Sequence, residues 1–301
     1  MELVKLKPAV KDYIWGGNYF QSFNKGTNLE RVSECWELSV RDNDSSIIAS
    51  GKDENKPLVD VISKADIGPV MERFPYFPLL IKLIDAKENL SVQVHPSDAY
   101  ALKNENSFGK SEMWHIISAD EGSGLYVGLN KDYKQEDIQK AFEEGTILDC
   151  LNFYRVKPGD TFVINPGTIH AIGKGVRLIE IQQNSNLTYR LYDYNRVDKN
   201  GQARELHIAK ALEVIDYRKY KSDNNSDGLL ADNQYFTVKK VSFDEELEIK
   251  TDQKAFVSFT FLDGEGIVND IPYQRYDTFF LPYQKKCLIK GKGTVVISTV
   301  R

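Results

Sequence analysis

Short apolar runs, each broken by Gly, Pro, Asn or Asp, make up most of the chain. This pattern is typical of antiparallel β structure, in which short strands alternate with tight turns. In the first two thirds of the chain, strands are predicted at residues 78–84, 90–94, 113–117, 161–164, 176–182 and 187–194. The last two runs flank Gln183-Asn184-Ser185-Asn186, so we expect them to form a hairpin.

Helical periodicity is confined to a few segments. Residues 133–144 carry apolar side chains at helical spacing, and Gly145 is expected to end this helix. Residues 206–217 place their apolar side chains on one helical face, and residues 96–103 are a candidate short helix with Ser97 near its start. The helical region at about 130–152 interrupts the strands, which predicts a helical insertion in a β domain.

A polar segment at residues 221–228, Lys-Ser-Asp-Asn-Asn-Ser-Asp-Gly, is the best candidate for a linker. Strand-like runs resume after it at 236–241, 255–262, 278–281 and 294–299. Their strand–turn rhythm weakly repeats that of the first part. We therefore expect a larger domain, residues 1–220, and a smaller one, residues 230–301. The smaller domain contains no histidine, so we expect it to bind no metal and to serve packing.

Composition narrows the functional classes. The 16 Tyr, 15 Phe and 3 Trp favour β structure. The net charge of −5, without a block of Lys and Arg, argues against nucleic acid as a partner. No apolar run reaches about 18 residues and the first residues mix charged with apolar side chains, so neither a membrane span nor a signal peptide is expected. Cys35, Cys150 and Cys287 form no paired motif, which indicates reduced thiols and a cytoplasmic location.

The candidate chemistry centres on two of the four histidines. His95 follows Gln93 by two positions, so on a strand their side chains face the same way. Glu112 adds a carboxylate, and the Pro-Gly turn before His170 is expected to deliver a second imidazole from another strand or loop. Imidazole nitrogen with carboxylate oxygen suits a divalent transition metal, zinc first. The sequence therefore predicts a metal site.

The other two histidines are poorer ligand candidates. His115 lies three positions after Glu112, so on a strand it points to the opposite face. His207 lies in a helical stretch, where a surface or capping position is expected.

Several motifs resemble those of type I mannose-6-phosphate isomerases. They occur in the family's order, from residue 13 to about 196, at residues 13–17 (Tyr-Ile-Trp-Gly-Gly), 91–96 (Ser-Val-Gln-Val-His-Pro), 110–113 (Lys-Ser-Glu-Met), 167–170 (Gly-Thr-Ile-His) and 186–190 (Asn-Leu-Thr-Tyr-Arg). One departure is visible: the usual Pro-x-Gly-x-x-His pattern is replaced by Asn165-Pro166-Gly167-Thr168-Ile169-His170, with the proline shifted by one place.

This resemblance implies a zinc-dependent aldose–ketose isomerase built from two cupin-like jelly-roll barrels. It implies one zinc ion per chain, with Gln93, His95, Glu112 and His170 at the ligand positions. The implied reaction interconverts mannose 6-phosphate and fructose 6-phosphate through a cis-enediolate, with zinc polarising the oxygens at C1 and C2. The implied partner is thus a small sugar phosphate. The resemblance does not decide whether the protein is a monomer or a dimer.

The resemblance also suggests roles for residues around the metal. Lys110, with Ser91, is a candidate to hold the phosphate or to assist ring opening. Arg190 is a candidate for a charge placed against the enediolate. Glu180 is a candidate proton shuttle, or alternatively orients Arg190 or a metal ligand. Trp15 is expected to form part of the wall of the substrate pocket.

Two other functions fit part of this pattern. A metal-dependent cupin oxygenase using iron is one, because two histidines and a carboxylate also form the facial triad of such enzymes. The amide ligand and the pair of cations, Lys110 and Arg190, argue against it. The other is a non-catalytic sugar-binding cupin, because the same fold hosts many functions.

Overall fold

The computed structural model of the chain describes residues 1–197, 201–221 and 228–301. Within these ranges the strands form three antiparallel sheets accompanied by a few short helices, which confirms the mainly β prediction. None of the described helices has the length and apolar character needed to cross a bilayer. The predicted linker at 221–228 falls almost entirely outside the described residues.

The first sheet contains six strands in the order β10-β7-β12-β5-β3-β2. Their bounds are β2 (Ala9–Lys11), β3 (Glu34–Leu38), β5 (Leu79–Ala86), β7 (Glu112–Ala119), β10 (Thr161–Ile164) and β12 (Val176–Gln183). Strand β5 is buried along its whole length. It pairs with β3 on one side and β12 on the other. This central position fits its mostly apolar sequence, which is typical of a fully buried strand.

The second sheet contains five strands in the order β13-β6-β11-β8-β9. Their bounds are β6 (Val92–Val94), β8 (Gly124–Leu129), β9 (Leu151–Arg155), β11 (His170–Ile172) and β13 (Tyr189–Tyr192). One core cluster joins the first two sheets, because it contains Ile84 and Trp114 from the first and Val127 and Ile172 from the second. The two sheets therefore pack face to face around a shared core.

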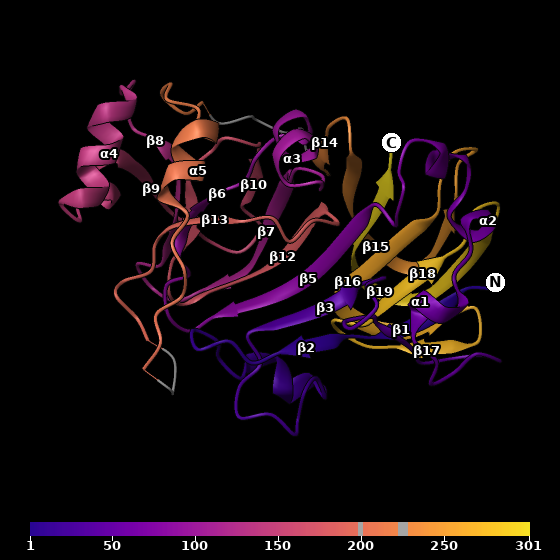
Figure 1. The fold of residues 1–301 in the computed structure, drawn as a ribbon. Helices are drawn as coiled ribbons and strands as arrows, with labels where there is room; N and C mark the ends of the chain where they lie inside the picture. Colours follow the sequence, from indigo (N-terminus) through magenta and orange to yellow (C-terminus); the bar gives the residue numbers. More distant parts are fainter. Residues whose placement is uncertain (198–200, 222–227) are drawn as a thin grey trace.

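The third sheet contains eight strands, most of them from the C-terminal part of the chain. Their bounds are β1 (Val4–Lys7), β4 (Ile47–Ile48), β14 (Leu229–Asp232), β15 (Phe236–Lys250), β16 (Val257–Val268), β17 (Ile271–Tyr273), β18 (Thr278–Leu281) and β19 (Lys286–Val300). Strand β1 pairs with β18, with Val4 opposite Phe280, so both ends of the chain lie in this part of the molecule (Figure 1). The division into residues 1–220 and 230–301 stays a prediction. Strand β1 pairs with β18 across it, and β4 joins the same sheet through β1.

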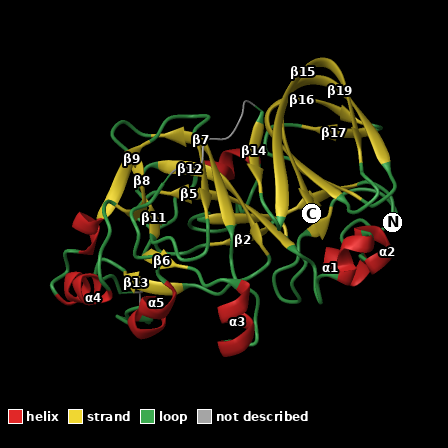
Figure 2. Ribbon diagram, turned by 90° about the horizontal axis from the view of Figure 1, so that it is seen from above, coloured by secondary structure: helices red, strands yellow, loops and turns green. Residues whose placement is uncertain are grey.

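The helices are short and lie around the sheets (Figure 2). The α-helices are α1 (Leu58–Val61), α2 (Lys64–Ile67), α3 (Asp98–Asn104), α4 (Gln135–Glu143) and α5 (Ile208–Val214), and the 3₁₀ helices are Tyr19–Phe23, Pro69–Glu72 and Ile147–Cys150. Helix α3 begins as expected, because the Ser97 hydroxyl accepts a hydrogen bond from the Tyr100 N–H. Helix α4 ends before Gly145, whose φ of +71° continues the chain in a left-handed conformation.

The predicted hairpin across residues 183–186 is wrong. Strand β12 belongs to the first sheet, whereas β13 pairs with β6 in the second. The connecting segment crosses between the sheets and is anchored there: the Asn184 side chain donates to the Phe77 carbonyl, its backbone N–H donates to the Pro78 carbonyl, and the Gln182 amide donates to the Ser185 carbonyl. The polar residues of this segment resemble a solvent-exposed turn, but their hydrogen bonds fix a buried connection between the two sheets.

Candidate active site and metal centre

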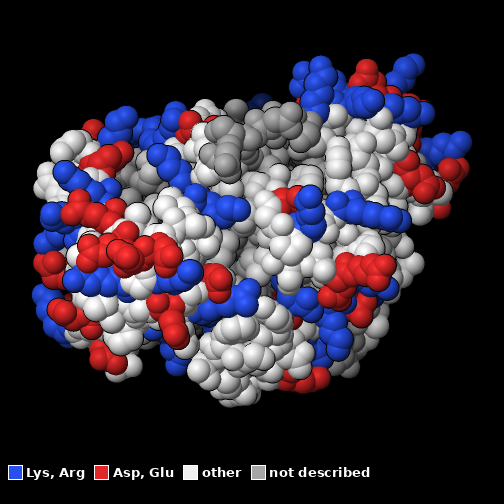
Figure 3. All heavy atoms as spheres, turned by 180° about the vertical axis from the view of Figure 1, so that it is seen from behind, with Lys and Arg blue, Asp and Glu red and all other residues white. Residues whose placement is uncertain are grey.

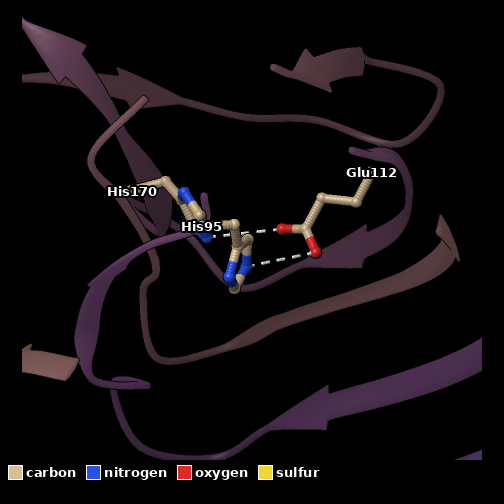
Figure 4. A group of neighbouring side chains, drawn as sticks. All are labelled: His95, Glu112 and His170. Atoms are coloured by element: carbon tan, nitrogen blue, oxygen red, sulfur yellow. Dashed lines mark ion pairs between the residues drawn. The ribbon is translucent and has the colours of Figure 1, made fainter. Parts of the chain in front are cut away.

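Three of the four predicted ligands form a buried group. His95 directly follows β6, Glu112 begins β7 and His170 begins β11, so the two packed sheets bring them together. Their ligand atoms all lie within 4.8 Å of one another. Glu112 Oε1 is 3.3 Å from His170 Nε2, and Glu112 Oε2 is 3.5 Å from His95 Nε2 (Figure 4).

Backbone carbonyls orient both imidazoles. His95 Nδ1 lies 3.0 Å from the Leu187 carbonyl oxygen, and His170 Nδ1 lies 2.8 Å from that of Thr168. A carbonyl oxygen only accepts hydrogen bonds, so each Nδ1 carries the proton and donates it. The lone pair of each neutral ring is then on Nε2, the atom that faces Glu112. This second layer of hydrogen bonds is typical of histidines that bind a metal.

Gln93, the fourth predicted ligand, lies beside this group. It is opposite His170 in the pairing of β6 with β11, and its Nε2 atom is 3.3 Å from His170 Nε2. On its other side β6 pairs with β13, which places Arg190 opposite Gln93. Gln93 therefore lies between His170 on β11 and Arg190 on β13.

The charges in the group fit a metal site. Burial alone would raise the pKa of Glu112, but Lys110 and His95 outweigh it and hold that pKa well below its ordinary value. Burial, reinforced by Lys110, lowers the pKa of His95 to about 3. Both Glu112 oxygens are buried and accept no well-directed hydrogen bond from the described residues, although Lys110 Nζ is 2.6 Å from Oε2. An ionised carboxylate and two neutral imidazoles are a donor set that suits zinc.

A pocket of about 360 Å³ opens next to this group. Every other residue that the sequence suggested for the site lines it: Trp15, Ser91, Gln93, Lys110, Glu180 and Arg190. The grouped residues His95, Glu112 and His170 are themselves at most 1% exposed and lie beneath this lining. The arrangement gives a small polar ligand access to the edge of a buried cation site.

One wall of the pocket carries charged residues that the sequence analysis missed. Lys82 on β5 donates to Glu180 Oε1 at 2.9 Å and lies 3.7 Å from Glu34 Oε2 on β3. Glu180 Oε2 accepts a further hydrogen bond from Trp114 Nε1. Burial alone would lower the pKa of Lys82, but the two carboxylates raise it above its ordinary value. The missed signal was Lys82, which interrupts the otherwise apolar residues 79–84 of β5.

The opposite part of the lining contains two arginines. Arg190 Nη1 donates to the Glu205 carbonyl oxygen at 2.9 Å, and its Nε is buried without a hydrogen-bond partner among the described residues. Arg204 Nε and Nη2 donate to the two carboxylate oxygens of Asp193 at 2.8 and 2.6 Å. Burial, followed by the charge of Arg204, lowers the pKa of Arg190.

Comparisons with known proteins place this site in a family. The profile described as "Phosphomannose isomerase type I, catalytic domain" matches residues 3–121. The Bacillus subtilis mannose-6-phosphate isomerase ManA is 36% identical over 291 residues, covering 92% of each chain. The chain belongs to the type I phosphomannose isomerase family. The probable mannose-6-phosphate isomerase GmuF of the same organism is 42% identical over 215 residues, covering 70% of this chain and 67% of that protein.

A solved structure supports the same assignment. The crystal structure of the mannose 6-phosphate isomerase from Bacillus subtilis matches with a TM-score of 0.88 at 32% identity and covers 99% of both chains. As a type I phosphomannose isomerase, the chain is an isomerase with the cupin-like fold that its motifs implied. The buried group of His95, Glu112 and His170 is where a member of this family is suited to hold a metal ion.

The two remaining histidines of this isomerase lie outside that group, as predicted. His115 is buried, and its Nδ1 is 2.7 Å from Thr161 Oγ1 on β10. His207 is the N-cap residue of α5, and its Nδ1 accepts a hydrogen bond from the Arg190 N–H at 3.3 Å. His207 thus supports the backbone next to Arg190 rather than the ligand group.

Proposed function

We propose that this isomerase interconverts mannose 6-phosphate and fructose 6-phosphate and uses one zinc ion per chain. The observation that carries the proposal is the pocket of about 360 Å³, which lies against the buried His–Glu–His group and is lined by Lys110 and Arg190. The proposal agrees with the names of two relatives, the mannose-6-phosphate isomerase ManA and the probable mannose-6-phosphate isomerase GmuF. Cys35, Cys150 and Cys287 are free and buried, which supports work in the reducing cytoplasm.

In this proposal His95, Glu112 and His170 hold the zinc ion together with Gln93. The buried Glu112 carboxylate and the two histidine Nε2 atoms directed at it support the ligand set. When bound, the ion supplies Lewis-acid stabilisation of negative charge on a sugar oxygen. The ligand set contains one negative charge, so the centre keeps a net positive charge.

Lys110 acts at the metal end of the pocket. Its Nζ is 2.6 Å from Glu112 Oε2 and 3.1 Å from His95 Nε2. Of the two roles that the sequence suggested, this position favours assistance to ring opening over binding of the phosphate. There the ammonium group donates hydrogen bonds to the sugar oxygens nearest the reacting carbons.

Glu180 is the proposed proton-transfer group. Two hydrogen bonds, from Lys82 Nζ and Trp114 Nε1, fix its carboxylate at the pocket wall. In the described part of the chain these hydrogen bonds come from Lys82 and Trp114, and none comes from Arg190. This favours the role of proton shuttle over the alternative role of orienting Arg190. Glu180 takes the proton from C2 of the open aldose and returns it to C1, with a cis-enediolate between the two steps, while the hydroxyl proton of O2 passes to O1.

Arg190 provides positive charge against the enediolate, where stabilisation of the developing oxyanion matters most. It lies opposite Gln93 across the strand pair, close to the ligand group. Ser91 and Trp15 complete the substrate pocket. The Ser91 hydroxyl offers a donor and an acceptor to the sugar, and Trp15 offers an apolar wall.

The experiment that tests this function combines metal analysis with turnover. Purified protein is expected to contain one zinc ion per chain and to convert mannose 6-phosphate to fructose 6-phosphate under anaerobic conditions. Chelation should abolish the activity and added zinc should restore it. Zinc-loaded protein that fails to interconvert the two sugar phosphates contradicts the proposal, and a strict requirement for oxygen points to an oxygenase instead.

A further inference from the structure

Most positive charge in the pocket is already matched by carboxylates. Lys110 faces Glu112, and Lys82 lies between Glu34 and Glu180. Apart from the proposed zinc ion, which serves the reacting end of the sugar, these two groups carry two positive and three negative charges, so their side chains do not neutralise an added anion. Acidic and basic side chains are likewise interspersed over the face of the molecule in Figure 3.

The arginine end of the pocket is different. Arg190, Arg196 and Arg204 gather around one carboxylate, that of Asp193, which pairs with both Arg196 and Arg204. Three arginines and one aspartate leave a charge of +2 among the described residues. The charge of Glu205 also acts on Arg190, but its side chain is 83% exposed and is screened by water. A phosphate monoester carries about −1.5 to −2 at neutral pH, so it matches this excess.

The position of Arg204 suits the far end of a substrate. Arg190 lies between Gln93, its cross-strand neighbour, and the Glu205 backbone, which directly follows Arg204. Arg190 and Arg204 both line the pocket. In a hexose 6-phosphate the reacting carbons and the phosphate are at opposite ends of the carbon chain. With C1 and C2 near the metal group, the phosphate extends past Arg190 towards Arg204.

We propose that Arg204 binds the phosphate group of the substrate and that Asp193 positions it for this task. This inference rests on the proposed sugar phosphate substrate. Asp193 holds one edge of the Arg204 guanidinium through two parallel hydrogen bonds, a geometry that fixes an arginine side chain. Asp193 pairs with Arg196 as well as with Arg204. Its single negative charge therefore orders Arg204 but leaves the cluster of three arginines with a net positive charge. A side chain already ordered loses less conformational entropy when the ligand binds.

The test compares substrates with and without the phosphate. In zinc-loaded Arg204→Gln, the KM for mannose 6-phosphate should rise by about 10- to 100-fold with kcat retained, the result of lost uniform binding. Inhibition by inorganic phosphate should weaken by a similar factor. The kcat/KM for unphosphorylated mannose should stay unchanged, because that substrate has no group for Arg204 to bind.

Two further variants separate binding from folding. Arg204→Lys keeps the charge but loses the paired hydrogen bonds to Asp193, so it should restore part of the affinity for phosphate. Arg218→Gln is the matched control. Arg218 also pairs with an aspartate, Asp216, through Nε and Nη2, but it does not line this pocket. Its KM for mannose 6-phosphate should equal that of the wild type.

Two results overturn the inference. One is an unchanged KM and phosphate inhibition in Arg204→Gln, and the other is an equal loss with mannose and mannose 6-phosphate. If the wild type itself shows no isomerase activity, the proposed function fails separately. Calorimetric titration of the zinc-loaded wild type and Arg204→Gln with inorganic phosphate then decides the role of Arg204: weaker binding in the variant supports it, and equal binding removes it.

Discussion

The backbone N–H of Gly167 donates a hydrogen bond to the carbonyl oxygen of His95, with 2.9 Å between the two atoms. Because Gly167 lies three positions before His170, this bond joins the segments that carry the two imidazoles. The Gly167 carbonyl in turn accepts from the Asp216 N–H, just after α5. The shift of the proline by one place thus leaves the loop tied to both the first imidazole and the neighbouring helix.

We expect Gly167→Ala to weaken the metal centre. Gly167 has φ of +88°, and an added Cβ would lie 3.0 Å from the Val214 carbonyl oxygen. The left-handed conformation costs a residue with a Cβ about 1–2 kcal/mol, and relief of that strain should move His170. The melting temperature and the zinc content should both fall. Gly159→Ala is the control, because Gly159 has φ of +96° but open space around its Cβ, so it should lower stability and keep the zinc.

The ligand assignment predicts that metal and activity disappear together. His95→Ala and His170→Ala should each lose zinc and turnover while keeping the circular dichroism of a folded β protein, because the apolar core does not depend on the ion. His115→Ala provides a buried histidine outside the group and should retain zinc. Full zinc content and full rate in either ligand variant would falsify the assignment.

Gln93→Glu tests the amide separately. A second carboxylate beside His170 should hold zinc at least as tightly, but it reduces the positive charge of the centre. A weaker Lewis acid should lower kcat even when zinc is saturating. Equal kcat at full zinc occupancy would show that the amide has no electrostatic part in the reaction.

Arg190 and Lys110 are expected to differ in kinetic signature from Arg204. If Arg190 faces the reacting carbons, Arg190→Ala should lower kcat by about 10²–10³, as for loss of an oxyanion donor, with a modest change in KM. Lys110→Ala should also act mainly on kcat, because Lys110 lies at the metal end. Steady-state kinetics at saturating zinc decide between the roles. A raised KM with normal kcat in Arg190→Ala would move Arg190 to the phosphate subsite.

His115 should make stability depend on pH. Burial, followed by the charge of Lys240, lowers the pKa of His115 to about 4, against about 6.5 in an unfolded chain. Between these values the unfolded chain binds a proton that the folded chain does not, so the free energy of unfolding should fall as the pH drops from about 6.5 to about 4. The loss should be on the order of 3 kcal/mol.

The measurement is urea unfolding across this pH range, with chelator present so that release of metal does not contribute. His115→Asn, which cannot take up the proton, should show a shallower pH dependence than the wild type. Identical slopes for the two proteins would mean that other groups cause the acid destabilisation.

The C-terminal strands should be needed for a soluble chain. Truncation after Tyr220 removes β14 to β19 and leaves the edge of β1 that pairs with β18 exposed, so aggregation is the expected outcome. A gentler change is Phe256→Ala. Phe256 is fully buried against Phe77 and Phe280, and its loss should cost about 3–5 kcal/mol. kcat below the melting temperature should be normal. A soluble truncation with the normal rate would refute this expectation.

Local patterns predicted individual elements well. Residues 161–164 form β10, residues 78–84 lie largely within β5, and residues 133–144 contain α4. For each of these segments, the pattern of apolar residues or the residue that ends the element can be read from the segment itself or from its direct neighbours. The extent of β15 and β19 was missed because their outer halves alternate charged residues, which pair across the strands as in Glu248–Lys286, instead of apolar ones.

Pairing over long distances was beyond the sequence pattern. Nothing local to β12 tells whether β13 or β5 lies beside it, and the polar crossing at Asn184 resembles an ordinary turn. The spacing of Gln93 and His95 indicated a ligand face, but the complete ligand set came from the resemblance. The link from Lys82 to Glu34 and Glu180 joins three strands, so it became visible only in the sheet.

The pairing of β1 with β18 has a consequence for biosynthesis. Val4 is synthesised long before its partner Phe280, because most of the given sequence lies between them. At about 5–20 residues per second, β1 waits on the order of tens of seconds for the strand beside it. The edge of β1 that later pairs with β18 is available to chaperones, or to other nascent chains, throughout that interval. Strand β1 therefore completes its pairing long after it is synthesised, and this part of the third sheet closes only once β18 has emerged.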